Sequence, residues 1–581
     1  MIPLSHAQNR LWLADRLGGR DQSHHLPLTL RLVGELDTRA LRQALTDVVA
    51  RHEMLRTVFP AKGGIPYQLI LGDAMVRLPV IDVDEAGLAA ELADAVAEPF
   101  DLQRAIPLRV RLFRLGPHRH VLLVVLHRIA ADRQSLRPFV TGLCEAYEAR
   151  CAGMPPAWKP LSVQYADFAL WQRDVLGDVR DPDSVLSRQL DRWCMALAGL
   201  PPRLRLPGES PGRVRPGGPA ESVAFRIGPA LHRELHALTR KCRATLFMAL
   251  HAALAATLSS LGAGHDIPVA SPVAGRSDEV LEGLIGCFGN VLIVRTDTAD
   301  NPSFRELLAR VRERVLFAYG HEEVPFDLLA EEIAPAAAAA GEPLVQVMLA
   351  LNCAGPPRPV LPGLTVTDER IAAPTALVDL ELAFTEHRLA NGDPGGISGS
   401  LVHAAELFDR ATAESLIERL LAVLREAVAE PDPVPGTLEL LGPRHGRGAL
   451  PKSRTGHATS RSRRAGRLRS GEETAAGECP LRDAAGAYRA TVPRSAATPL
   501  EASLCQILAS VLERNDVAPE DDFFELGGDS TLAVRVVSRI RATLGADLGV
   551  CTVFDAPTAA QLADALAESE SETPEDDLPR A

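Results

Sequence analysis

The chain has 581 residues, of which 46% are hydrophobic and 24% charged, a balance typical of globular protein and enough for roughly two to four domains. Its net charge of −13 argues against general nucleic-acid binding, which relies on a basic surface. The scattered cysteines form no C-x-x-C pair, and no segment has the length of a membrane span, so we expect a cytoplasmic protein with reduced thiols, no metal site and no membrane anchor.

Strand-like and helix-like patterns alternate from the N-terminus. Residues 28–36 alternate between apolar and polar side chains like a half-buried strand. Residues 37–55 carry apolar residues at helical spacing, and Asp37 can serve as the N-cap of this helix. The continuous apolar run VLLVVLH (121–127) predicts a strand buried on both faces. Apolar residues from 136 to 147 then recur at helical spacing.

A similar series returns later in the chain. Residues 231–261 read as helix, 266–275 and 290–297 as strands, and 303–320 as helix again. This is an α/β pattern that appears twice.

The periodicity disappears over residues 443–497. The stretch 444–469 holds nine Arg or Lys and no acid, interleaved with Gly, Ser, Thr and Pro. A nuclear or nucleic-acid signal is one interpretation. We favour a disordered, Arg-rich linker, because the stretch lies between two well-patterned regions.

Helical patterning resumes over 498–567. Apolar faces at 500–512 and 533–544, a short segment at 553–554 and a last helix carrying Leu562 and Leu566 predict a small all-α bundle of four helices. The remaining 568–581 form an acidic tail that we expect to be disordered.

The segment DDFFELGGDS (521–530) places Ser530 at a predicted helix start, after a Gly-Gly turn. Taken alone, Ser530 or Asp529 is equally an N-cap. Residues 499–567 as a whole, including FDAPTAAQLADAL (554–566), resemble peptidyl carrier proteins. The resemblance implies that a phosphopantetheinyl transferase attaches 4′-phosphopantetheine covalently to Ser530, and that the arm carries aminoacyl or peptidyl thioesters.

The first 440 residues resemble the condensation domains of nonribosomal peptide synthetases. The motifs occur in the family's order: SHAQNRLW (5–12), RHEMLRTVF (51–59), YADFALWQRD (165–174), the stretch 272–297 and HEEVPFDLL (321–329). The resemblance implies two chloramphenicol-acetyltransferase-like lobes of α/β class, which we place at 1–177 and 178–442. Between them lies a tunnel in which two carrier-bound substrates meet.

The family's central motif, HHxxxDG, is degenerate here. Residues 127–133 read HRIAADR, so His127 and Asp132 are kept while Arg128 replaces the second His and Arg133 the Gly. In active members the second His positions, and is a candidate base for, the attacking amine. A guanidinium has no lone pair to accept a proton, so Arg128 cannot take that role.

The retained residues of the motif read as structural rather than catalytic. His127 is interpreted as a packing and hydrogen-bonding residue, and Asp132 as the partner of an arginine from the other lobe, with Arg276 the candidate. An Arg at position 128 resembles the X-domains of glycopeptide-antibiotic synthetases, condensation-like domains that recruit cytochrome P450 enzymes to a carrier-bound peptide.

The expected protein is a nonribosomal peptide synthetase component with no adenylation domain, in which the carrier is loaded in trans beside a condensation-like domain impaired in amide formation. The implied partners are a trans-acting adenylation enzyme, an upstream carrier protein and the transferase. Two alternatives stay open. One is an active condensation enzyme that works without the second His; the other is a binding module that recruits a tailoring oxygenase.

Overall fold

The computed structural model describes residues 1–17, 24–206, 208–209, 218–276, 278–339, 342–352, 359–369, 375–389, 392–429, 498–546 and 548–571. The predicted linker at 443–497 and the tail beyond 571 lie outside these residues.

The first lobe is built on a five-stranded sheet with strand order β13-β2-β8-β7-β6. Along the central strand β8 (Arg119–His127), side chains at even positions from Leu122 to Leu126 enter one core cluster, and those at odd positions from Val121 to Val125 enter another. The burial on both faces predicted from the apolar run is therefore confirmed. The other elements are β1 (Ile2–Pro3), α1 (His6–Leu17), β2 (His25–Gly34), α2 (Thr38–Arg51), η2 (Glu53–Arg56), β3 (Thr57–Val58), β4 (Ala61–Lys62), β5 (Ile65–Ile70), β6 (Val80–Asp82), α3 (Leu88–Ala97), β7 (Leu108–Gly116), α4 (Leu136–Cys151) and α5 (Tyr165–Leu176).

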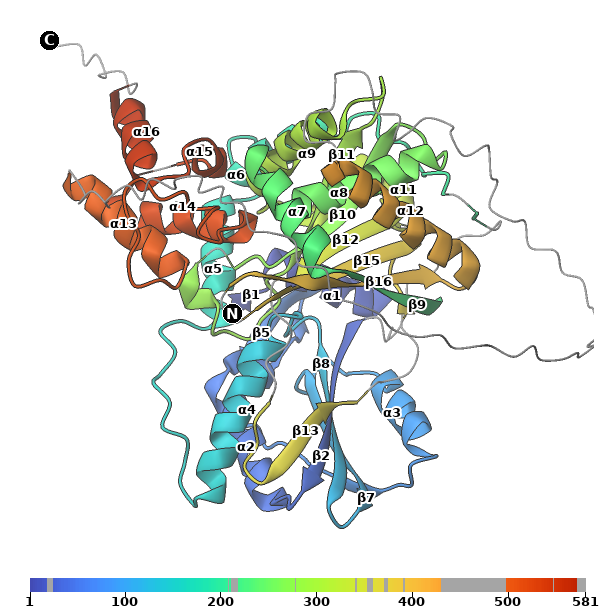
Figure 1. Ribbon diagram of the computed structural model, residues 1–581. Helices are drawn as coiled ribbons and strands as arrows, with labels where there is room; N and C mark the ends of the chain where they lie inside the picture. The colour runs from blue at the N-terminus through green and yellow to red at the C-terminus, as the bar shows by residue number, and fades with distance from the viewer. Residues whose placement is uncertain are drawn as a thin grey trace, which may run out of the picture.

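The second lobe contains a seven-stranded sheet with order β11-β10-β12-β15-β16-β9-β14, and helices lie over it in Figure 1. Its helix α9 (Phe304–Tyr319) and strands β10 (Asp266–Val273) and β11 (Asn290–Asp297) agree with the sequence prediction. The other elements are α6 (Val185–Ala196), β9 (Gly218–Ile227), η3 (Glu279–Leu281), α10 (Phe326–Ile333), α11 (Pro335–Ala339), β12 (Val347–Asn352), β14 (Thr375–Ala376), β15 (Leu380–Arg388), β16 (Pro394–Ala404) and α12 (Arg410–Ala429).

One strand from the second half of the chain joins the sheet of the first lobe. Strand β13 (Leu364–Asp368) pairs antiparallel with β2, from Leu364 opposite Gly34 to Asp368 opposite Leu30. The second half of the chain therefore contributes a strand to the sheet of the first lobe, and a division of the chain at residue 178 does not divide the two sheets.

The stretch 231–261, read from sequence as helix throughout, forms two helices that bend by 100°, α7 (Pro229–Lys241) and α8 (Leu246–Ser260). Between them Arg243 adopts a left-handed φ of 48°, and Thr245 accepts a hydrogen bond from Met248 N–H at 3.3 Å as the new N-cap. No single helix among the described residues is long and apolar enough to cross a membrane. The bent pair α7–α8 reaches that length only when its two helices are taken together.

The C-terminal region forms the predicted helical carrier bundle, drawn in orange and red beside the second lobe in Figure 1. Its core contains Leu504, Phe523, Ile540 and Phe554, each at most 1% exposed. The last helix runs to Ser571 and so includes the first residues of the segment expected to be disordered, in which the first helix-breaking proline is Pro574. The helices are α13 (Pro499–Val511), α14 (Ser530–Leu544), α15 (Val550–Asp555) and α16 (Ala559–Ser571).

Candidate functional site

His127, the last residue of β8, is 1% exposed. Its Nδ1 accepts a hydrogen bond from Ile129 N–H at 3.1 Å, so the neutral ring carries its proton on Nε2. Burial, and then the neighbouring charges of His24, His25 and Arg128, hold the pKa of His127 well below its usual range. The ring is therefore neutral, and its one lone pair is already engaged.

Arg128, the next residue, has an exposed side chain, and its backbone N–H donates to the His24 carbonyl at 2.8 Å. Partial desolvation by surrounding atoms lowers the pKa of Arg128, and the positive charges of Arg10 and Arg133 act in the same direction. Because an arginine starts from a pKa above about 12, the group stays charged at neutral pH. The structure thus places a permanent cation where active family members place an imidazole.

Asp132 lies in the loop after β8 and meets Arg276 from the second lobe. The guanidinium donates through Nη1 to Oδ2 at 2.7 Å and through Nη2 to Oδ1 at 3.0 Å. Arg276 is 5% exposed and stacks over the Phe288 ring at 4.4 Å. This bidentate ion pair joins the two lobes.

Two further residues complete this junction. Ser135 donates its N–H to Asp132 Oδ1 at 2.8 Å and its hydroxyl at 2.9 Å, while Phe288 N–H donates to Oδ2 at 3.1 Å. Both carboxylate oxygens of Asp132 thus already accept hydrogen bonds from the protein. Phe288 stands inside the quoted stretch 272–297, but nothing in the sequence marked it or Ser135 as partners of Asp132.

Arg133 and Gln134 follow Asp132, and both side chains are exposed. They lie in the loop that precedes α4, where Leu136 N–H donates to the Arg133 carbonyl at 3.3 Å. Neither residue belongs to the buried network around Asp132.

Ser530 is the first residue of α14, and Asp529 caps the helix by accepting from Leu532 N–H at 2.9 Å. Both preceding glycines have a steric reason. Gly527 has a φ of 107°, which favours glycine, and a Cβ on Gly528 would lie 2.3 Å from the Phe523 ring. The two glycines therefore allow a tight turn beside Phe523 that leads into α14, with Asp529 as the N-cap and Ser530 as the first helical residue.

The carrier helix start lies against the second lobe. Ser530 is 4% exposed, and its hydroxyl donates to the Tyr319 hydroxyl at the end of α9, at 3.4 Å. The motif residues thus form two separate groups. His127, Arg128 and Asp132 gather at the end of β8, and Ser530 lies beside α9.

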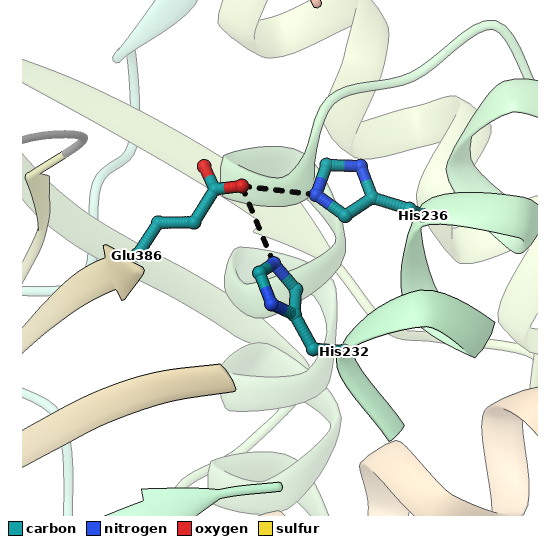
Figure 2. Close-up of side chains that lie close together, drawn as sticks. All are labelled: His232, His236 and Glu386. Carbon is teal, nitrogen blue, oxygen red and sulfur yellow. Dashed lines mark hydrogen bonds and ion pairs between the residues drawn. The ribbon is translucent and has the colours of Figure 1, made fainter. Parts of the chain in front are cut away.

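A third group of titratable side chains joins His232 and His236 on α7 to Glu386 on β15 (Figure 2). Glu386 Oε1 lies 3.3 Å from His232 Nε2, 3.1 Å from His236 Nε2 and 2.9 Å from Arg388 Nη2. Burial alone would raise the pKa of Glu386, but these donors hold it well below its usual range.

The spacing of these three residues is that of a metal site, but the hydrogen bonding is not. Gly396 N–H donates to His232 Nδ1 at 3.1 Å, so the proton of the neutral ring sits on Nε2, the atom that faces Glu386. A histidine that binds a metal through Nε2 donates its Nδ1 proton instead. We therefore interpret the cluster as a polar network around the Glu386 carboxylate that ties α7 to β15.

Two family models match the chain. The condensation domain covers residues 1–447, and the phosphopantetheine attachment site covers 502–566. The chain is 47% identical over 441 residues to a probable non-canonical nonribosomal peptide synthetase, CymA, of Salinispora arenicola, and 44% identical over 444 residues to a dimodular nonribosomal peptide synthase of Bacillus subtilis. These matches cover 76% of this chain but only 6% and 19% of those proteins.

Among solved structures, the chain is similar to the X-domain from teicoplanin biosynthesis, seen in complex with OxyB. The identity is 38% and the TM-score 0.68, over 74% of this chain and 94% of the X-domain. The fold class, the carrier bundle and the covalent 4′-phosphopantetheine cofactor predicted from sequence are confirmed by these matches. The chain belongs to the condensation-domain family of nonribosomal peptide synthetases, here joined to a phosphopantetheine carrier domain.

Proposed function

We propose that this chain holds a substrate as a thioester on a phosphopantetheine arm at Ser530 and presents it to enzymes that act in trans. In the attachment step the Ser530 oxygen bonds to the pantetheine phosphorus of coenzyme A. The P–O bond to 3′,5′-ADP breaks with its electron pair, and the hydroxyl proton passes to the transferase. The match to the attachment-site family and the position of Ser530 at the start of α14 support this assignment.

Loading of the arm falls to a separate adenylation enzyme. The stretch between the two family matches, 448–501, is too short for an adenylation domain of several hundred residues. An upstream carrier protein is the donor in this scheme. We place the system in the cytoplasm, where coenzyme A is available to the transferase.

The condensation-like domain does not form amides by the histidine-assisted route in this proposal. Arg128 is the observation that carries it: the residue at the base position has no lone pair and stays charged. Neither neighbour replaces it, because the His127 lone pair accepts from Ile129 N–H and Asp132 is fully hydrogen-bonded. Losing a positioned base typically costs about 10²–10⁴ in rate.

The domain acts instead as a docking platform for a tailoring oxygenase, of the cytochrome P450 type implied by the X-domain resemblance. Support comes from the 38% identity over 94% of an X-domain that is itself seen in complex with OxyB. Both the platform and the carrier then serve one recruited enzyme.

The second candidate is an active condensation enzyme that relies on orientation of two tethered substrates. Orientation supplies large rate factors without any base. The chain's 44–47% identity to synthetases favours keeping this candidate.

A condensation assay separates the two functions. The apo chain is loaded at Ser530 with an aminoacyl-phosphopantetheine arm, which a permissive transferase transfers from aminoacyl-coenzyme A, and a loaded carrier protein is supplied as donor. Mass spectrometry of the arm then detects any dipeptide. We expect no dipeptide above the level of a donor-free control, and rapid dipeptide formation would overturn the platform proposal in favour of the active enzyme.

A further inference from the structure

The Arg128 guanidinium has no counter-charge in the part of the chain that the structure describes. No hydrogen bond or ion pair joins it to another described residue. The nearby carboxylate of Asp132 is already bound by Arg276, at 2.7 and 3.0 Å. The nearby Cys287 thiol cannot serve as the anion either, because burial raises the pKa of Cys287 to about 12 and keeps the thiol neutral.

Two further guanidiniums add positive charge around Arg128. After desolvation, which is the largest cause, the like charges of Arg10 and Arg133 lower the pKa of Arg128. Arg10 on α1 forms an ion pair with Asp327 on α10 at 2.7 Å, whereas the Arg133 side chain is exposed. Together with the ion pair across the lobes, four guanidiniums surround two carboxylates, so the group has an excess of two positive charges.

Desolvation distinguishes Arg128 from an ordinary surface arginine. Surrounding protein lowers the pKa of three described arginines, Arg109, Arg128 and Arg173. Arg109 donates to three backbone carbonyls at 2.7–3.1 Å, and Arg173 donates to one. Among these three, Arg128 is the one without such an acceptor, although a desolvated cation is costly until one is supplied. Because the Arg128 side chain is exposed, a ligand can reach it and supply that acceptor.

We propose that Arg128 binds a carboxylate carried by the tethered substrate, and that Arg133 strengthens the positive field at this place. A guanidinium can donate two parallel hydrogen bonds to a carboxylate, which suits this anion. The phosphate of the arm is not the ligand, because it stays bonded to Ser530, whose oxygen lies beside Tyr319. The inference rests on the proposed function and names its substrate class: an acyl or peptidyl group with a free acid.

The departure from the family motif at residue 128 then exchanges a base for an anion-binding group. A histidine with an ordinary pKa is largely uncharged at neutral pH, whereas a guanidinium stays charged. A substrate that is presented to an enzyme in trans needs to be held, and it needs no base to activate an amine. Arg128 serves the first need and excludes the second.

The test uses two soluble thioesters, adipoyl-pantetheine and its terminal amide, adipamoyl-pantetheine. They have the same length and differ in one charge. Both lack the phosphate of the natural arm, so the carboxylate is the one anionic group of the probe. Isothermal titration calorimetry on the full-length apo chain measures the two dissociation constants. We expect the acid to bind roughly tenfold more tightly than the amide, the ratio that one hydrogen-bonded charge pair supports.

Substitutions at residue 128 then assign the preference to its charge. Arg128→Gln keeps a polar side chain without the charge and should make the two affinities equal, whereas Arg128→Lys should keep part of the preference. Arg42→Gln, at an exposed position of α2, is the matched control and should keep the wild-type ratio. Equal affinities for the wild type, absence of saturable binding by the acid, or a preference that survives in Arg128→Gln would overturn the anion site.

A loading experiment keeps this inference apart from the proposed function. A permissive transferase is supplied with adipoyl- and adipamoyl-coenzyme A, and intact-mass spectrometry detects the arm on the wild type and on Ser530→Ala. If neither arm is attached to Ser530, the proposed function fails, whatever the calorimetry shows. If both arms are attached and the calorimetry shows no preference for the acid, the anion site at Arg128 fails and the proposed function stands.

Discussion

Arg276 forms a bidentate ion pair with Asp132 across the boundary between the two lobes. The two terminal nitrogens of Arg276 lie 2.7 and 3.0 Å from the two carboxylate oxygens of Asp132. The side chains are 3% and 15% exposed, so each charge depends on the other in a poorly hydrated place. The pair holds the loop after β8, and therefore Arg128, in a fixed position relative to the second lobe.

Removing one member of this pair should destabilise the condensation-like domain. For Asp132→Asn we expect a loss of about 3 kcal/mol, since the buried guanidinium is left without its counter-charge. Urea unfolding followed by tryptophan fluorescence measures the change. The exposed Asp178, paired with Arg180 on the surface, gives the control Asp178→Asn, which should unfold like wild type. Equal behaviour of the two variants would contradict a structural role for the Asp132 pair.

Ser530 should be the single site of phosphopantetheine attachment. Incubation with a transferase and coenzyme A is expected to add one prosthetic group to wild type and none to Ser530→Ala, as read by intact-mass spectrometry. Ser503→Ala on the neighbouring helix α13 is the matched control and should be modified fully. An adduct that persists in Ser530→Ala would refute the assignment.

Arg128 should account for the absence of histidine-assisted catalysis. In the condensation assay, Arg128→His is expected to gain dipeptide formation over an inert wild type, because it restores a base with a pKa near working pH. Arg128→Ala, which removes the cation without adding a base, should remain inert. If the wild type is fast and Arg128→Ala is equally fast, catalysis proceeds without this position and the interpretation is wrong.

The buried His251 should make the protein less stable in mild acid. Its Nε2 lies 3.0 Å from the Thr296 hydroxyl, and burial lowers the pKa of His251 to about 3. The unfolded chain binds a proton near pH 6.5 and the folded one only near pH 3, so this stabilisation is complete above pH 6.5 and is lost as the pH falls. The loss is about 1.4 kcal/mol per pH unit.

The corresponding measurement is urea unfolding at pH 7.0, 6.0 and 5.0. His251→Gln keeps a donor towards Thr296 but does not titrate, so its stability should fall less steeply with acid than that of wild type. His387→Gln, at an exposed position of β15, should keep the wild-type slope. Parallel slopes for wild type and His251→Gln would show that His251 does not remain neutral in the fold.

Chelation should leave the His232–His236–Glu386 cluster unaffected. Because Gly396 N–H donates to His232 Nδ1, we interpret the cluster as a polar network and not as a metal site, and the thermal midpoint should not change with EDTA or with added zinc. Glu386→Gln should lower the midpoint at pH 7, since it removes the anion shared by both histidines and Arg388. A rise of several degrees with zinc that is lost in Glu386→Gln would instead establish a metal site.

The sequence by itself determined the features that depend on local pattern. The unbroken apolar run of β8 predicted a strand covered on both faces, and Asp37 accepts from the N–H groups of Arg39 and Ala40 as an N-cap does. The order of the family motifs was sufficient to identify both domains. The identity of residue 128 alone excluded a base at that position, because a guanidinium lacks a lone pair whatever surrounds it.

Only the tertiary structure decided what depends on contacts between distant parts of the chain. Apolar residues keep a helical spacing across the break between α7 and α8. The sequence pattern therefore does not show where the 100° bend lies. The partners of Asp132 include Phe288 N–H, 156 residues away, and backbone groups carry no sequence signature. Likewise, the motif around Ser530 identifies a serine at a helix start. The contact of the Ser530 hydroxyl with Tyr319 arises from packing between two domains, which no local spacing encodes.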